Sequence, residues 1–554
     1  MRSDQPEDAR RGGLPAGEGL SPLLRYKSPL GRWVLFVTVL GSALAFIDAT
    51  VVNIALPHIG RSLGADSAGL QWTTNGYTLA LTSFILLGGS LGDRLGRRRV
   101  FLVGAAWFAV ASLLCGLAPR IEVLVAARVL QGIGGALLTP GSLALLQASF
   151  RPEDRARAIG AWSGLGGVGG ALGPFLGGWL LEVASWRLVF LINVPLAAVV
   201  VVAGLRHLPE SKDPGAERRL DLAGAAAAAA GLAGLCYGFI AWSARGIRSP
   251  AVPAALCLGA AGWAAFLLRE RRTEEPMLPL EVFSSKTFTA ANIVTFAVYA
   301  ALGGVFFLVT LNLQVVAGFT PLAAGTAMLP ITVLMLLLSA RAGALSQRLG
   351  PRIPMALGPA VSALSLLLLS RVGAGASYLS DVLPAMVLQG LGLSLTVAPL
   401  TATVLGSVDD RHAGIASAVN NAVARAAGLL AVAILPLLGG LGHASLTDPL
   451  ALAPMYRNAM WICAGLLALA GAVALASIPG RAFADREGRA GPRASARGRY
   501  HCDVSGPPLA PPPPRRLWAR SPDPGGGRAT GSEWPRHDSS TRRGPWPEKG
   551  SSSL

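Results

Sequence analysis

Three ionisable side chains lie deep inside apolar stretches of the sequence: Asp48, Arg128 and Arg425. A charge near the centre of a bilayer costs at least ~3 kcal/mol, so a charge found there usually marks an ion or substrate pathway. Asp48 stands within FIDATVVNIALP (46–57), and the run 33–57 holds no other ionisable side chain. Burial disfavours the charged form of a carboxyl group and a nearby cation favours it, which is the balance a proton carrier needs. Buried charges of this kind therefore need a compensating partner, which for Asp48 can be a proton, a cation or a basic side chain.

The positions of Asp48 and Arg128 predict that the two side chains meet. At 1.5 Å per helical residue, Asp48 lies roughly 13 Å from the end of its run at Pro57, and Arg128 lies roughly 9 Å from Glu122. At such similar depths they can pair directly or through water. A purely structural ion pair that only fixes helix packing remains the alternative. Because a proton, a cation or Arg128 can offset the burial of Asp48, all three stay open at this point.

Arg425, in NNAVARAAG (420–428), has no acidic partner visible in the sequence. An intramembrane charge of this kind is functional by default. Either an anionic group of a substrate or backbone carbonyls can serve it. We also expect four amides to contribute hydrogen bonds beside these charges: Asn53, Gln131, Asn420 and Asn421.

The composition places these residues in an all-α polytopic membrane protein. Of 554 residues, 52% are hydrophobic and 14% are charged, and the mean hydropathy is +0.51. Soluble proteins carry about 25% charged residues. Apolar runs of about 20 residues, the length that spans a bilayer, recur about fourteen times. We place them near 33–57, 70–91, 100–118, 122–147, 156–181, 186–206, 221–243, 250–269, 288–316, 322–344, 353–372, 381–405, 413–440 and 457–479.

The net charge of +18 follows topology. Nineteen basic residues lie in the loops after even-numbered runs and seven lie in the opposite loops. Because cytoplasmic loops are enriched in Lys and Arg, we expect both termini in the cytoplasm, a location in the inner membrane, and no nucleic-acid partner. We expect a monomer that contacts the bilayer, protons and a small-molecule substrate.

Short stretches of the chain return at a nearly constant offset. VLQGIG (129–134) returns as VLQGLG (387–392), and RLGRR (94–98) returns as RLGPR (348–352). Both copies lie on the same side of the membrane, which predicts a parallel repeat of two six-helix bundles. The expected division is a cytoplasmic tail at 1–32, a first bundle at 33–207, a linker with two inserted helices at 208–286, a second bundle at 287–480, and a disordered cytoplasmic tail at 481–554.

Several motifs resemble those of the fourteen-helix drug:proton antiporter family of the major facilitator superfamily. They are DATVVNIALP (48–57), GSLGDRLGRRR (89–99), RVLQGIGGA (128–136) and GALGPFLGGWL (170–180). The resemblance implies the major facilitator fold, and an efflux antiporter that exports amphipathic or cationic compounds by alternating access. It implies coupling of protons and substrate at Asp48 and Arg128, to which we add Arg425 as the other intramembrane charge. SWRLVFLINVP (185–195) is a further family mark, to which we assign only packing.

Two of these motifs imply a conformational role. GSLGDRLGRRR implies a latch in which Asp93 faces the start of a helix near Arg411; its members are Gly89, Gly92, Asp93, Arg94, Gly96, Arg97 and Arg98. Ordinary topology signalling also explains the arginines. GALGPFLGGWL implies a flexible helix between the bundles, through Gly173, Pro174, Gly177 and Gly178, although glycine-mediated packing alone is the simpler alternative.

The sequence also bears on functions other than drug export. The sequence holds no metal-binding or nucleophile motif, so we expect no enzyme, no metal and no cofactor. GLGGVG (164–169) fits a dinucleotide pattern but lies within an expected membrane helix. A dedicated exporter of one endogenous metabolite, an importer of the same fold and a non-transporting membrane sensor remain as alternatives.

Overall fold

A computed structural model describes residues 23–480 except 213–220, 274–277, 279, 409–412 and 443. In this part of the chain the secondary structure is helical, with a single isolated bridge between Leu24 and Phe150. The expected tail at 481–554 and the helix start near Arg411 lie outside the described residues.

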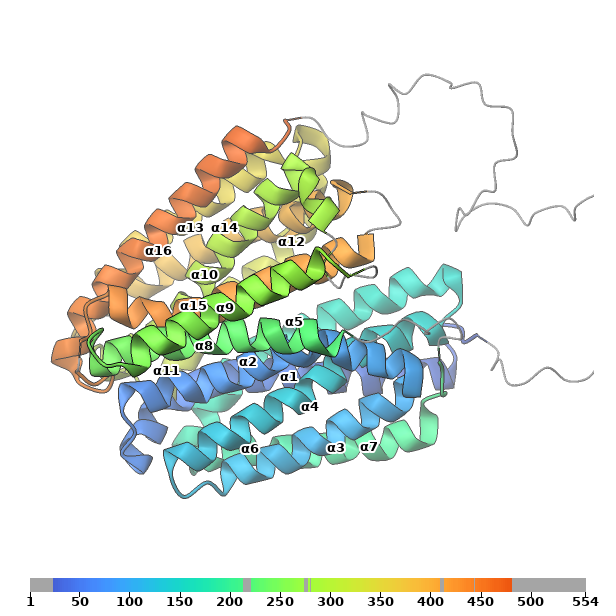
Figure 1. Ribbon diagram of the computed structural model, residues 1–554, viewed down its shortest axis with the longest axis horizontal. Coiled ribbons are helices and arrows are strands. Elements are labelled where there is room, and N and C mark those ends of the chain that lie inside the picture. The colour runs from blue at the N-terminus through green and yellow to red at the C-terminus, as the bar shows by residue number, and fades with distance from the viewer. Residues whose placement is uncertain are drawn as a thin grey trace, which may run out of the picture. The chain divides into compact units, whose positions relative to one another are not determined.

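The helices fall into three consecutive groups along the chain (Figure 1). The first group is α1 (Pro29–Leu63), α2 (Ser67–Leu95), α3 (Arg97–Gly116), α4 (Ile121–Ser149), α5 (Pro152–Val183), α6 (Arg187–Leu191) and α7 (Asn193–His207). The second is α8 (Leu222–Arg245) and α9 (Ala251–Glu270). The third is the 3₁₀ turn η1 (Leu280–Ser284), α10 (Lys286–Val315), α11 (Pro321–Thr326), α12 (Leu329–Leu349), α13 (Arg352–Leu369), the π turn η2 (Tyr378–Val382), α14 (Leu383–Gly406), α15 (Ala413–Leu438) and α16 (Pro449–Ser477).

Counted over the described residues, these elements form fourteen helical segments, because α6 continues into α7, α11 into α12, and η2 into α14. Twelve of the fourteen are long and apolar enough to cross a membrane. The other two are α2 and α5, with 29 and 32 residues. The expected all-helical polytopic fold is confirmed. The helices run past the apolar runs that predicted them: α1 begins four residues before position 33 and ends six residues after position 57.

Local sequence sets where the helices begin. Ser28 caps α1 by accepting a hydrogen bond from the Gly31 N–H at 3.1 Å, and Pro29 takes the first helical position. Asp66 caps α2 in the same way, at 2.7 Å from the Gly69 N–H. Such caps satisfy backbone donors that have no partner inside the helix.

Three membrane segments are interrupted, each just before a proline. α6 gives way to α7 two residues before Pro195, α11 to α12 shortly before Pro330, and η2 to α14 before Pro384. Proline has no N–H and its ring clashes with the preceding turn, so a continuous helix is disfavoured at these points. The first break matters for the site, because it places Asn193 at the start of α7.

Helices of the first group pack mainly on one another: α2 with α4, α3 with α4, and α1 with α5. Those of the third group do the same, with α13 on α14 and α16, and α10 on α15 and α16. α8 and α9, drawn in green in Figure 1, pack side by side. α8 also contacts α2 and α15, through a cluster of apolar side chains that includes Leu232, Cys236 and Leu429.

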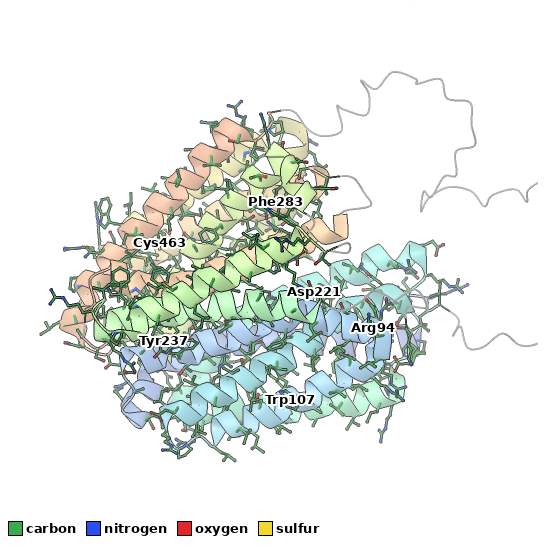
Figure 2. All side chains as sticks on the ribbon, in the orientation of Figure 1. Arg94, Trp107, Asp221, Tyr237, Phe283 and Cys463 are labelled. Carbon is green, nitrogen blue, oxygen red and sulfur yellow. The ribbon has the colours of Figure 1, made fainter. Side chains whose placement is uncertain are left out.

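The first and third groups are hydrogen-bonded to each other near one end of the helices. The Gln71 amide donates to the Val432 carbonyl at 2.8 Å, and the Gln314 amide donates to the Ile54 carbonyl at 3.0 Å. Ser67 bonds the segment that follows α15. In Figure 2, Arg94 and Asp221 lie toward one end of the helices and Tyr237 toward the other. Ser67 and Gln71 line one pocket with Ile240 and Ser243 of α8, and Trp72 lies beside Tyr237, so the bonds of Ser67 and Gln71 lie at the Tyr237 end.

Candidate functional site

The Asp48 carboxylate lies fully buried in α1 and accepts hydrogen bonds from three side chains. Arg128 Nη1 donates to Oδ2 at 2.5 Å, which is also an ion pair. Gln131 Nε2 donates to Oδ1 at 2.8 Å, and Asn193 Nδ2 donates to the same oxygen at 3.0 Å. The expected meeting of Asp48 and Arg128 is thus direct, without a bridging water.

Arg128 is 1% exposed and ties α4 to two other helices. Its Nε donates to the Thr73 carbonyl of α2 at 2.9 Å, while Nη1 reaches Asp48 on α1. The guanidinium also stacks over the Tyr77 ring, with 4.4 Å from its central carbon to the ring centroid, and lies 5.7 Å from that of Phe190. Cation–π contacts of this kind are attractive in a desolvated setting.

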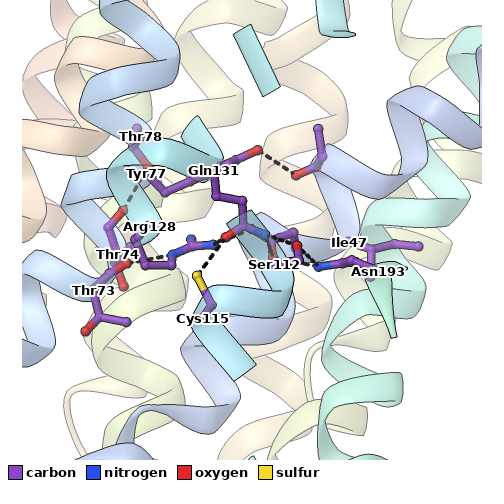
Figure 3. A network of polar contacts seen from close by, with 12 residues as sticks. Ile47, Thr73, Thr74, Tyr77, Thr78, Ser112, Cys115, Arg128, Gln131 and Asn193 are labelled. Atoms are coloured by element: carbon purple, nitrogen blue, oxygen red, sulfur yellow. Dashed lines mark hydrogen bonds and ion pairs between the residues drawn. The ribbon is translucent and has the colours of Figure 1, made fainter. Parts of the chain in front are cut away.

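Gln131 extends the network to α3 and α7 (Figure 3). Its Nε2 donates to Ser112 Oγ at 2.7 Å, and Asn193 Nδ2 approaches the same hydroxyl at 3.3 Å. The Arg128 Nη1 donates to Gln131 Oε1 at 2.5 Å. Five helices of the first group therefore meet at one buried polar cluster, which we call the Asp48 cluster: Asp48, Thr73, Ser112, Arg128, Gln131 and Asn193.

Ser112 and Asn193 were not among the residues expected at the site. Asn193 lies in SWRLVFLINVP, which was assigned to packing alone. Both are polar residues in apolar runs, and both are fully buried. That signal was available in the sequence, but their meeting depends on how α3 and α7 pack beside α1. Asn193 Oδ1 has no hydrogen-bond partner among the described residues, so the cluster keeps one acceptor unused.

The chemistry open to this cluster is proton exchange. Three hydrogen bonds and one ion pair compensate the burial of this carboxylate. A proton on Oδ2 would compete with Arg128 Nη1 for that oxygen. Breaking a buried ion pair in place is strongly unfavourable.

The other expected polar residues lie apart from the cluster or at its margin. Asn53 accepts a long contact of 3.5 Å from the Thr74 hydroxyl. Asn420 Nδ2 donates to Thr295 Oγ1 at 2.6 Å, within the third group of helices. Asn421 is exposed and bonds its own helix, at the Ser417 carbonyl.

Arg425 lies half-buried in α15, on the opposite group from the Asp48 cluster. It forms no ion pair or hydrogen bond with any described residue, and its electrostatic neighbours are Tyr77 and Tyr299. Tyr77 also stacks on Arg128. Tyr77 therefore neighbours both Arg128, which is paired with Asp48, and Arg425 of the third group.

The loop of GSLGDRLGRRR is tied within its own group of helices. Asp93 pairs with Arg97 at 2.8 Å, one turn along the chain. The Arg98 N–H donates to Glu210 Oε1 at 3.1 Å, and the Arg97 N–H donates to the Ser211 carbonyl at 2.9 Å. Gly96 joins α2 to α3 with a φ of 114°, which residues with a side chain rarely adopt. The hydrogen bond that Glu210 accepts from the Arg98 N–H was not expected from the sequence.

Three other members of that motif, Gly89, Gly92 and Arg94, lie near the end of α2. A Cβ on Gly89 would lie 3.7 Å from Pro140, and one on Gly92 would lie 3.9 Å from Arg97. Both are ordinary contacts, so neither glycine is required there by close packing. Arg94 is half-buried near the end of α2.

The glycines of GALGPFLGGWL bring α5 into backbone contact with two helices. A Cβ on Gly173 would lie 2.0 Å from Thr50 Oγ1 of α1, and one on Gly178 would lie 2.5 Å from the Leu322 Cα of α11. Gly177 lies against the Val51 carbonyl. Gly325 of α11 approaches the carbonyl of Pro174. α5 is thus packed without intervening side chains against both groups of helices.

Comparison with known proteins places these features in a family. The sequence profile described as Major Facilitator Superfamily matches residues 38–432. The tetracenomycin C resistance and export protein of Streptomyces glaucescens is 36% identical over 73% of this chain and 75% of its own length. The multidrug resistance protein Stp of Mycobacterium tuberculosis (strain CDC 1551 / Oshkosh) is 36% identical over 70% of this chain and 72% of its own.

Solved structures share the fold at low sequence identity. A bacterial homolog of the human lysosomal transporter Spinster, in an inward-facing and unoccupied conformation, superposes with a TM-score of 0.59 and 18% identity. The match covers 83% of this chain and 98% of that one.

Proposed function

We propose that this chain, which belongs to the Major Facilitator Superfamily, exports amphipathic small molecules in exchange for protons. Relatives at 36% identity carry the names of drug resistance and export proteins. Membership of the family, together with those names, supports a transporter with a drug-efflux role. The expected extension to cationic compounds stays a prediction.

The observation that carries proton coupling is the Asp48 cluster. Asp48 is the one carboxylate placed far from both ends of a described membrane helix, and a charged partner holds it. We propose that a proton on Asp48 releases Arg128, and that deprotonation restores the pair. Because α1 and α4 move when the pair opens, the proton is linked to the conformation of the first group of helices. Arg425 is proposed to take part from the other group on the substrate side of the coupling, without carrying the proton.

We propose that the first and third groups of helices are the two halves that rock against each other, with α8 and α9 inserted between them. The bonds at the Tyr237 end then close one side of the transporter. With the arginine-rich loops in the cytoplasm, that closed side is the outer one, and both termini are cytoplasmic. The backbone contacts of α5 with α1 and α11 form part of this outer seal. A monomer in the inner membrane is sufficient for this cycle.

Asp93 and its neighbours are proposed to bias one conformation. In the described state Asp93 is held by Arg97, and Glu210 holds the backbone of Arg98. These two contacts therefore join the proposed latch to residues of the first group of helices and their flanking loop. The helix start near Arg411, its expected counterpart, lies outside the described residues.

A second candidate is export of one dedicated compound. One relative is named for a single compound, tetracenomycin C, and the other for multidrug resistance. The two names differ in substrate range, so both ranges are compatible with membership of this family.

Inside-out vesicles energised with a proton gradient test the proposal. A panel of lipophilic cations and neutral drugs is added, and dissipation of the gradient is followed with a pH-sensitive dye. We expect wild type to release protons with at least one compound, and Asp48→Asn to release none while folding normally. Glu122→Gln, which neutralises an exposed acid at the start of α4, is the matched control and should behave as wild type.

Equal responses of wild type and Asp48→Asn would make the cluster structural and exclude it from coupling. A response to a single compound would favour the dedicated exporter. No response to any compound would contradict drug efflux.

A further inference from the structure

Two apolar grooves flank the end of α1 that lies beside the arginine-rich loops. The larger, of about 1000 Å³, runs between α1 and α7 and is lined by Trp33, Phe36, Val199 and Val202 among others. The smaller, of about 560 Å³, runs between α1 and α5 and is lined by Phe36, Leu35, Val39 and Leu165 among others. Both grooves share three residues: Lys27, Arg32 and Phe36.

The three shared residues form a ridge between the grooves, and two of the three are positively charged. Phe36 is 46% exposed and separates the two grooves, and Lys27 and Arg32 are exposed above it. Arg206, from the end of α7, adds a third cation to the larger groove. Among the described residues, no acid lines either groove and none of the three cations forms an ion pair.

An acid beside this ridge, Asp154, is already engaged. Asp154 of α5 accepts the Tyr26 N–H at 2.9 Å, and Arg157 stacks over the Tyr26 ring at 4.6 Å. The region around the ridge is therefore net positive. The N-terminus of α1 points the positive end of its helix dipole the same way.

The side chains that line the two grooves are mostly apolar. Trp33 is 43% exposed and stacks on His207 with 4.4 Å between ring centroids, and Val202 is 50% exposed. Trp and His at such a position have an apolar body and a polar edge, which suits the boundary between headgroups and acyl chains. In membrane helices such exposed apolar side chains face acyl chains, and the two grooves give these chains two separate paths along α1.

We propose that this end of α1 binds one anionic two-chain phospholipid. Its phosphate lies at Lys27 and Arg32, with Arg206 beside it, and one acyl chain lies in each groove on either side of Phe36. The division of the apolar surface into two grooves beneath one pair of cations selects a two-chain lipid over a soluble phosphate. The site is separate from the Asp48 cluster and does not depend on the proposed function.

Native mass spectrometry of the purified full-length protein, with phosphatidylglycerol or phosphatidylcholine of the same chains, tests this site. We expect wild type to retain one phosphatidylglycerol more tightly than phosphatidylcholine. In the double variant Lys27→Gln/Arg32→Gln, binding of phosphatidylglycerol should weaken roughly 10- to 30-fold, since each basic residue near an anionic surface contributes about 1 kcal/mol. Arg271→Gln/Arg272→Gln, which removes the same charge from exposed positions after α9, should bind as wild type.

A second variant tests the grooves with the charges intact. Val202→Trp fills part of the larger groove at an exposed position and should also weaken binding of the two-chain lipid, while single-chain lysophosphatidylglycerol is retained in the smaller groove. Equal binding of the two headgroups would overturn the proposal. So would equal losses in the two double variants, or full competition by inorganic phosphate, which would assign the cations to a soluble anion.

Discussion

The two repeated halves carry the same four residues, VLQG, at 129–132 in α4 and at 387–390 in α14. In α4 they follow Arg128, and Gln131 joins the Asp48 cluster. In α14 they follow the buried Met386, and the Oε1 of Gln389 has no partner among the described residues. One motif therefore supports a charged cluster in one half and an uncharged core in the other.

What the halves share is packing. A Cβ on Gly132 would lie 2.3 Å from the Tyr77 carbonyl of α2, and one on Gly390 would lie 3.0 Å from the Ile331 Cα of α12. These glycines let a neighbouring helix approach closely in both copies. The repeat thus preserves how helices meet, while the ionisable chemistry is concentrated in the first half.

Arg128→Met gives the first half the residue that the second half has, and we expect the largest effect. Asp48 would be left as an unpaired buried charge, so the free energy of unfolding should fall by about 3–5 kcal/mol. Drug export in vesicles should fall to background. Thermal denaturation in detergent and vesicle efflux measure the two effects.

Adding Asp48→Asn to Arg128→Met removes the unpaired charge. The double variant should recover most of the stability but not the export. Wild-type stability and export in Arg128→Met alone would show that the two halves do not differ in the way described.

Gln131→Leu and Gln389→Leu form a matched pair at repeated positions. Gln131→Leu removes hydrogen bonds to Asp48 and Ser112 and should destabilise the protein by about 1–3 kcal/mol. Gln389→Leu replaces a buried amide whose oxygen is unpaired, so stability should be unchanged or slightly higher. Denaturation curves of both variants, recorded side by side, decide the matter; equal losses would erase the asymmetry.

Arg425→Gln tests whether charge chemistry is confined to the first half. Arg425 has no ion-pair partner among the described residues, so its loss leaves no charge uncompensated. We expect export to fall several-fold and the number of protons released per substrate to stay the same. A changed proton count would show that both halves share the coupling.

Asn420→Ala should have the smallest effect. Its bond to Thr295 is neutral and lies within the second half, so about 1 kcal/mol of stability should be lost. Export per folded molecule should not change. Loss of export at normal stability would place this asparagine in the transport path.

Much of the fold could be predicted because nearly all backbone polar groups of a membrane helix must be hydrogen-bonded within the helix itself. Apolar length therefore located the membrane segments, and the repeated VLQG indicated two similar halves. The breaks at Pro195 and Pro330 were not predicted, although proline gave a signal for each. A helix that continues past its apolar run, as α1 does, depends on caps rather than on hydropathy.

The ion pair of Asp48 with Arg128 could be predicted because few charges stand far from the ends of membrane runs, and two of them lie at similar depth. Ser112 and Asn193 could not be assigned to it, since hydrogen-bond partners across helices depend on the rotation of each helix. The hydrogen bond from the Arg98 N–H to Glu210 was missed because Glu210 lies in the loop after α7, whose path depends on how α7 packs on α3. Its contact joins residues 112 positions apart.

The most direct test of the central claim, that Asp48 exchanges the coupled proton, is proton release from purified protein. The compound that wild type exports best in vesicles is added in a weakly buffered solution, and a pH indicator reports the protons released. The account predicts about one proton per bound substrate for wild type and none for Asp48→Asn with substrate still bound. The same release from both proteins would contradict it and leave the ion pair with a structural role.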